Sequence, residues 1–336
     1  MSFKRFETED LVVSAEPVSA PVWSTGTPTL TTFYTSSTQA GSTSGNYYLD
    51  VYQTGSSLDN ATVQFAVAYA DKVGSGSNAY NTAVTGKSYS TTIYGQYRSL
   101  VLGDEDTNFN FAGTNSEYFY VIAIDRDRFK ESLLPASFNL TLVNGSDTLE
   151  LTDNSVDSTT VSFNDAGRVY QVISGSNGQA YSGTGYSPNS GSYGYFLPDI
   201  GIIILNGEAL DETGVNGGIA LGTGRTSVTP SPSNPAKLYN AITAGGSFQL
   251  NYKETISSQF VFARVRNSEF NYSTNPSYIT GSGDLRIANM VDAPQTYITT
   301  VGMYNDNNEL LAVAKLSKPL LKDFTKEALV RIKLDF

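Results

Sequence analysis

The sequence predicts a mainly β protein with antiparallel β-sandwich or barrel-like sheets, few short helices and an inserted β-rich region. Apolar and polar residues alternate along many short runs, and Gly, Asn, Ser and Pro separate these runs. Such alternation places apolar side chains on one face of a strand, and such separators favour turns. With 336 residues, 40% of them hydrophobic, the chain can form one large β-domain with an insertion or two domains.

The C-terminal end is the clearest β region. The apolar run 297–304, the turn residues 305–308 and the run 309–316 predict a β-hairpin. In the last run, 328–336, every second residue is apolar, so one face of the expected strand is apolar: Val330, Ile332, Leu334 and Phe336. We expect this strand to be tied into a sheet.

We expect four segments along the chain. Residues 1–45 read as an extended N-terminal arm, because Pro17, Pro21 and Pro28 punctuate short apolar islands; a partly disordered terminus is the alternative. Residues 46–154 form the first part of a β-domain, residues 155–256 an inserted β-rich region, and residues 257–336 the C-terminal strands that complete the β-domain.

The composition of individual segments predicts their structure. Four strand predictions rest on β-branched, aromatic or continuous apolar runs: 62–69, 91–102, 118–124 and 199–205. Asn144-Gly145 predicts a hairpin turn between the strands 137–143 and 148–151. Two stretches have helical character, 125–134 before Pro135 and 235–242 before a Gly pair.

The charge of the chain argues against two classes of partner. A net charge of -11 disfavours binding to nucleic acid and to anionic membranes. Residues 315–336 carry six basic and three acidic side chains, so this end is +3 and the rest of the chain is -14. This asymmetry could steer head-to-tail contacts between copies, or it could reflect an ordinary solvated strand face.

Two residue types are missing from the sequence. Without Cys there are no disulfides and no thiolate chemistry, and without His there is no Ser-His-Asp triad and no ordinary zinc site. The first ten residues do not resemble a signal peptide, and the longest aliphatic run, 200–205, is too short to span a membrane. We therefore expect a protein made in the cytosol and kept there unless it leaves within a particle.

The motifs that could carry chemistry are weak. Segment 104–110 begins like a calcium loop, but Phe109 and Asn115 stand where the loop requires Gly and Glu, so an acidic turn is the better interpretation. Segment 217–227 faintly resembles a phosphate loop but lacks its Lys. A carboxylate-pair glycosidase needs no His, yet no two carboxylates can be placed together and Trp23 is the single Trp. We predict no catalytic, cofactor-binding or metal-binding residues.

Several stretches resemble one family of proteins. The segments 261–277, 296–319 and 331–336, and also 94–105 and 167–177, are similar to virion structural proteins of contractile-tailed bacteriophages, especially those of marine cyanobacteria. The resemblance implies a non-enzymatic subunit of the tail, baseplate or neck, assembled in the host cytoplasm with copies of itself and other virion proteins. A receptor-binding or glycan-degrading tail protein and a capsid decoration protein are the alternatives.

Overall fold

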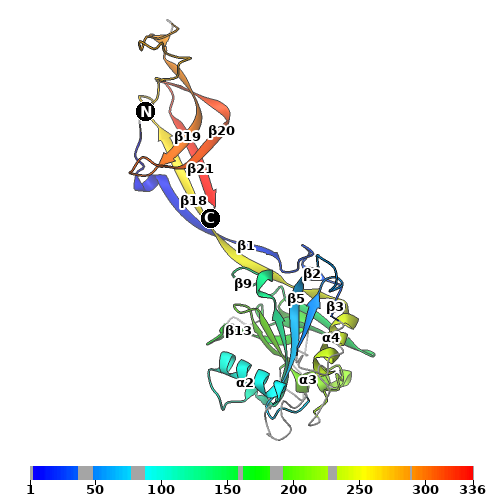
Figure 1. The fold of residues 1–336 in the computed structure, drawn as a ribbon. Coiled ribbons are helices and arrows are strands. Elements are labelled where there is room, and N and C mark those ends of the chain that lie inside the picture. The colour runs from blue at the N-terminus through cyan, green and yellow to red at the C-terminus, as the bar shows by residue number, and fades with distance from the viewer. Residues whose placement is uncertain are drawn as a thin grey trace. The chain divides into compact units, whose positions relative to one another are not determined.

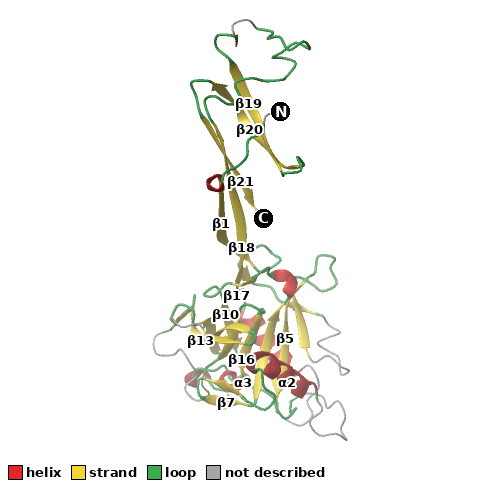
Figure 2. Cartoon of the chain, turned by 90° about the vertical axis from the view of Figure 1, so that its left-hand side faces the viewer, coloured by secondary structure: helices red, strands yellow, loops and turns green. Residues whose placement is uncertain are grey.

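The computed structural model describes residues 3–36, 48–76, 88–157, 162–181, 192–225, 233–287 and 290–335. Strands account for 46% and helices for 15% of the structure, which confirms the predicted mainly β class (Figure 2). The chain divides into two compact units: unit 1 comprises Met1–Pro17 and Thr255–Phe336, and unit 2 comprises Val18–Glu254. Within the described ranges, no helix is both long and apolar enough to cross a membrane.

Unit 2 is built on one large antiparallel sheet that curls into a half-barrel (Figure 1). Two short strands, β12 (Ser162–Asn164) and β14 (Gln179–Ala180), pair with β13 beside the main path. The main path runs in the order β2 (Thr29–Leu30), β17 (Phe248–Gln249), β10 (Asn139–Asn144), β11 (Asp147–Asp153), β13 (Gly167–Ser176), β15 (Gly194–Leu197), β16 (Ile202–Asn206), β8 (Tyr118–Ile124), β5 (Val63–Asp71), β4 (Tyr48–Tyr52) and β3 (Tyr34–Thr35).

The two ends of this sheet are held together by a short piece of chain. β2 and β3 are the terminal strands of the path, yet only residues 31–33 separate them in the sequence. Four Cα steps span at most about 15 Å, so the terminal strands must lie close to each other. Leu30 and Phe33 of this piece are buried in the core of unit 2.

The sheet has a hydrophobic core on each face. The larger core is covered by α3 (Gly207–Asp211) and α4 (Ser233–Gly245), and it includes Trp23, whose ring lies 4.9 Å from that of Phe248. The second core lies under α2 (Tyr89–Leu102). Burial of both sheet faces explains why β8 and β16 have almost no exposed side chain.

Unit 1 contains long strands around a small core. β18 (Asn251–Val265) pairs with β21 (Ala328–Asp335) in a sheet that also includes β1 (Leu11–Pro21), and β19 (Gln295–Tyr304) with β20 (Leu310–Asp323) forms a separate hairpin. The last residues of β1 and the first residues of β18 belong to unit 2, where Tyr252 and Lys253 pair with β9 (Ser132–Leu133). A 3-10 turn, η1 (Thr8–Asp10), precedes β1. The core that the two sheets of unit 1 share is formed by Val261, Met303, Val330 and Ile332.

Several element predictions are confirmed. The C-terminal hairpin pairs as β19 and β20, and β21 pairs with β18 over eight residues. Val330 and Ile332 point to the core as the alternation predicted, while Phe336 lies outside the described residues. The predicted strand 118–124 is β8, and the predicted helix 235–242 lies within α4.

The strand predicted at 91–102 is wrong, because this segment is the helix α2. Its β-branched residues favoured a strand, but Ile93, Tyr94 and Val101 are buried and Tyr97 packs beside them. This spacing matches one face of a helix and not one face of a strand. The helix ends at Gly103, which adopts φ +63° and donates its backbone N–H to the Ser99 carbonyl at 3.1 Å.

The helix expected at 125–134 is also wrong. Only the 3-10 turn η2 (Arg126–Arg128) forms there, and β9 follows. The Asp125 carboxylate accepts from the Asp127 N–H, and the Arg126 guanidinium donates to the carbonyls of Phe129 and Lys130. These side-chain bonds satisfy backbone groups that a helix would have used.

The segments of the chain are arranged differently from the four expected. β11 and β13 pair across the expected boundary at 155, so residues 155–254 continue the sheet that begins before it. The strands at 257–336, expected to complete that domain, lie in unit 1 around their own core. Within the expected arm at 1–45, Val22 and Trp23 are buried in unit 2; residues 37–45 lie outside the described ranges.

Candidate interaction surfaces

The outer side of the β19–β20 hairpin carries a cluster of exposed apolar side chains. Alternate residues of β20, Ala312 and Ala314, face the small core of unit 1, so the residues between them face outward. Val313 is 57% exposed, and Leu311, which has no partner in the register, is 68% exposed. We call this the outer apolar cluster: Phe3, Tyr304, Leu310, Leu311 and Val313.

Glycine shapes this cluster. A Cβ atom at Gly302 would lie 3.0 Å from the Tyr304 ring and 3.4 Å from the Leu310 side chain. The absence of a side chain at Gly302 therefore lets these two residues settle over the strand. The Phe3 ring meets the Tyr304 ring edge-on at a centroid distance of 5.3 Å. The cluster is thus ordered, although its members remain exposed.

Four of the six basic side chains of residues 315–336 contact other groups of the chain: Lys322, Lys326, Arg331 and Lys333. Arg331 lies 4.5 Å and Lys333 5.9 Å from the centroid of the Phe260 ring on the neighbouring strand β18. Lys333 also pairs with Asp335 at 3.1 Å. Lys322 is fully buried. These contacts reduce the positive charge that this end can offer to a partner.

The segment that resembles a phosphate loop is surrounded by carboxylates. Arg225 donates to the buried Asp71 at 2.9 Å and to Glu117 at 2.9 Å, and its guanidinium lies 4.7 Å from the centroid of the Tyr118 ring. Asp71 also accepts the backbone N–H groups of Val73 and Ser75. The one basic side chain of this segment is therefore already paired with two carboxylates.

Tyrosine hydroxyls complete this network. The Tyr193 hydroxyl donates to the Gly217 carbonyl at 2.6 Å, and the Tyr118 hydroxyl donates to Asp211 at 2.7 Å. Asp211 in turn accepts from both the backbone and the hydroxyl of Thr223 at 2.9 Å. Burial raises the pKa of Tyr193 to about 12 and also raises the pKa of Tyr118. The network fixes segment 217–225 on the sheet and needs no ligand to do so.

The segment that begins like a calcium loop is an acidic turn. The Asp104 carboxylate accepts the backbone N–H of Asp106 at 2.7 Å and the hydroxyl of Thr107. The hydrogen bond from Thr107 lowers the pKa of Asp104. Phe109 is buried in the core under α2. In the part of the chain that the structure describes, no cluster of carboxylates could hold a metal ion.

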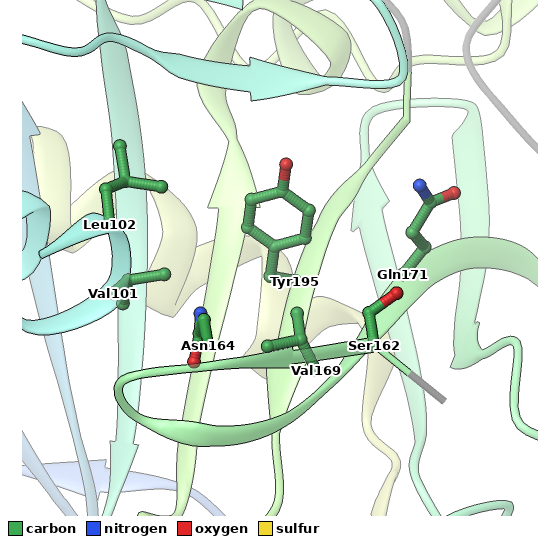
Figure 3. Close-up of a pocket in the computed structure, with 7 residues that line it drawn as sticks. All are labelled: Val101, Leu102, Ser162, Asn164, Val169, Gln171 and Tyr195. Atoms are coloured by element: carbon green, nitrogen blue, oxygen red, sulfur yellow. The ribbon is translucent and has the colours of Figure 1, made fainter. Parts of the chain in front are cut away.

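Unit 2 has a surface pocket of about 360 Å³ at the end of α2 (Figure 3). In Figure 3 the Tyr195 ring lies between Val101 and Leu102 on one side and Gln171 on the other. The Tyr195 hydroxyl donates to the Asn110 carbonyl, and burial raises its pKa. The described lining residues are Val101, Leu102, Ser162, Asn164, Val169, Gln171 and Tyr195.

The described lining of this pocket is apolar and uncharged polar. None of its described lining residues is a carboxylate, and Tyr195 is the one that can ionise. Glycoside hydrolysis requires a pair of carboxylates at the reacting bond, which these residues do not supply. Sequence reasoning missed the pocket because it assigned a strand to α2, whose C-terminal residues form one of its walls.

Comparison with known proteins gives no further identification. No protein-family model matches the chain, and neither the curated proteins nor the solved structures that were compared give a match.

Proposed function

We propose that this protein is a structural subunit of a bacteriophage virion, which assembles with copies of itself and with other proteins in the baseplate or tail-neck region of a contractile tail. The observation that carries the assembly role is the outer apolar cluster on the β19–β20 hairpin. Exposed apolar side chains grouped on one surface are typical of protein–protein contact sites. The phage context rests on the sequence resemblance alone.

The chemistry of the described residues is consistent with this role. The two motifs that could have bound a metal or a phosphate are an acidic turn and a paired Arg225, and the pocket in unit 2 lacks carboxylates among its described residues. The proposal therefore assigns no reaction to the chain.

The experiment that tests the proposal is quantitative mass spectrometry of purified particles from the parent phage. The proposal predicts the chain at a fixed copy number per particle, retained after high-salt washing and gradient purification. Capsid and tail fractions separated after disruption should place it in the tail fraction. Its absence from purified particles, or its presence in the capsid fraction only, would contradict the proposal.

A receptor-binding tail protein is the second candidate, and the pocket in unit 2 favours binding over degradation within that class. Its Tyr195 ring and the polar side chains of Ser162, Asn164 and Gln171 would suit a neutral sugar. A glycan array distinguishes the two functions. Binding that is lost in Tyr195→Ala but retained in the exposed control Tyr297→Ala would favour the receptor-binding function.

A further inference from the structure

The hairpin in unit 1 leaves one strand edge open. Within the described residues, β19 pairs with β20 alone, and its backbone makes no hydrogen bond to any other segment. An antiparallel strand presents about half of its backbone N–H and C=O groups to each side. A ten-residue strand therefore exposes a row of unpaired groups along its outer edge.

β19 differs from the other outer strands of unit 1 in carrying neither a charge nor a proline, and its ladder with β20 shifts register between Ile298 and Thr300. Proteins protect open edges with charged residues and proline. β20 carries Lys315, Lys318 and Pro319, β21 carries Arg331 and Lys333, and β1 carries Glu16 and two prolines. The sequence of β19, QTYITTVGMY, contains neither a charge nor a proline.

The side chains of β19 also favour strand pairing. Half of its ten residues are β-branched and two are Tyr, the types most frequent in strands. Thr299 and Thr300 near its middle are exposed, and its contacts with other segments lie at its ends, where the Thr296 hydroxyl donates to the Phe270 carbonyl and the Tyr304 ring meets Phe3. The middle of the edge is therefore accessible to an incoming strand.

We propose that the outer edge of β19 pairs antiparallel with β19 of a second copy of this chain, across a twofold axis. This inference rests on the proposed role as an assembling subunit and names the surface that joins two copies. In such a twofold pair, residue i of one strand faces residue j of the other and residue j faces residue i, so the residues nearest the axis meet their own counterparts. An uncharged strand such as β19 can pair with a second copy of itself without charge repulsion, whereas pairing β20 with itself would bring lysines together.

The cysteine-free sequence allows a sharp test. Thr300→Cys places a single thiol near the middle of β19, and Ser317→Cys places one at an exposed position of β20 as a matched control. Mild oxidation of the full chain should give a covalent dimer for Thr300→Cys, at least about tenfold more than for Ser317→Cys. Unchanged circular dichroism spectra would show that both variants fold.

A charged substitution in β19 tests the same contact through the dissociation constant of the non-covalent dimer. Thr300→Lys would place two lysines near the twofold axis, so the dissociation constant of the dimer should rise about tenfold or more. Because Thr300 also faces Lys315 within its own hairpin, an unchanged melting temperature is needed to assign the loss to the contact between copies. Ser317→Lys adds the same charge on β20 and should change the dissociation constant less than about twofold. Sedimentation velocity over a range of concentrations gives both constants.

The outcomes separate this inference from the proposed function. If the chain is a virion component and self-associates, but Thr300→Cys does not cross-link and Thr300→Lys does not weaken the oligomer, the β19 contact is wrong and the structural role stands. If Thr300→Cys cross-links in particles only to a different protein, the second copy is the wrong occupant. If β19 pairs but particles lack the chain, the virion role fails while the contact stands.

Discussion

At the residue scale, Lys322 shows how far the role of a side chain can depart from what its type suggests. It belongs to the run of basic residues that predicted a positively charged C-terminal end, yet its side chain is fully buried. Its ammonium group donates to the Asn267 carbonyl at 2.9 Å, to the Asn271 amide oxygen at 2.7 Å and to the Asp323 carbonyl at 2.8 Å. All three of its donors are satisfied, so Lys322 ties segment 267–271 to β20.

Replacement of Lys322 by Met should destabilise unit 1. The variant leaves three partly buried oxygens without this donor, so the free energy of unfolding should fall by about 1–3 kcal/mol, the cost of one unsatisfied buried group. Lys318→Met, at an exposed position of the same strand, should change the free energy of unfolding by less than about 0.5 kcal/mol. Urea denaturation followed by far-UV circular dichroism measures both. Equal midpoints for the two variants would show that the Lys322 contacts add nothing.

The buried tyrosines predict a loss of stability in alkali. The pKa of Tyr193 is raised by burial to about 12, whereas an unfolded Tyr ionises near pH 10. Between about pH 10 and pH 12 the unfolded chain releases a proton that the folded chain keeps, so stability falls as pH rises through this window. Burial raises the pKa of Tyr69 and Tyr120 as well, which strengthens the effect.

The single tryptophan provides the measurement. Trp23 lies in the core of unit 2, so its fluorescence reports unfolding of the unit that contains Tyr193. The urea midpoint should be nearly constant from pH 8 to about pH 9.5 and should fall steadily above pH 10. Tyr193→Phe should show a shallower fall. A midpoint that stays flat to pH 11.5 would contradict the buried, neutral state of these hydroxyls.

At the scale of elements, the sequence predicted a helix or strand correctly where the apolar residues follow a clear pattern. β8 was predicted from its aromatic and apolar run, and β21 was predicted from the strict alternation of apolar and charged residues. Both patterns are typical of strands. The predicted turn at Asn144-Gly145 is displaced by one residue: Asn144 pairs with Asp147, so Gly145 and Ser146 form the loop, and Gly145 adopts φ +62°. α2 was missed because its β-branched residues favour strands, while packing of Ile93 and Val101 against the sheet decides for the helix.

The final strand gives a direct test of how unit 1 is held together. Ile332 is buried beside Val261 and Met303, so Ile332→Ala should cost about 2–5 kcal/mol, at the lower end because this core is small. Leu329 on the opposite face is 59% exposed, and Leu329→Ala should cost less than about 0.5 kcal/mol. Thermal unfolding followed by circular dichroism compares them. Similar losses of stability in Ile332→Ala and Leu329→Ala would mean that β21 is not packed as described.

At the scale of the whole molecule, the features that could not be predicted from the sequence depend on contacts between residues that are far apart in the chain. β2 and β3 are only two residues long, so no periodicity could reveal that segment 29–35 joins the two ends of the sheet. The division into two units depends on which distant strands pair, such as β18 with β21 and β11 with β13. The outer apolar cluster was likewise not predicted, because both faces of the hairpin carry apolar residues and only the core of unit 1 shows which face is covered.

The central claim is that this chain is an assembly subunit, which exposes on unit 1 the surface by which copies join. Sedimentation equilibrium of the full wild-type chain tests it most directly, because the method gives the mass in solution without a label or a surface. The account predicts masses that rise with concentration from the 36.1 kDa monomer toward a whole-number multiple of it. A single mass of 36.1 kDa at every concentration up to the solubility limit would contradict it.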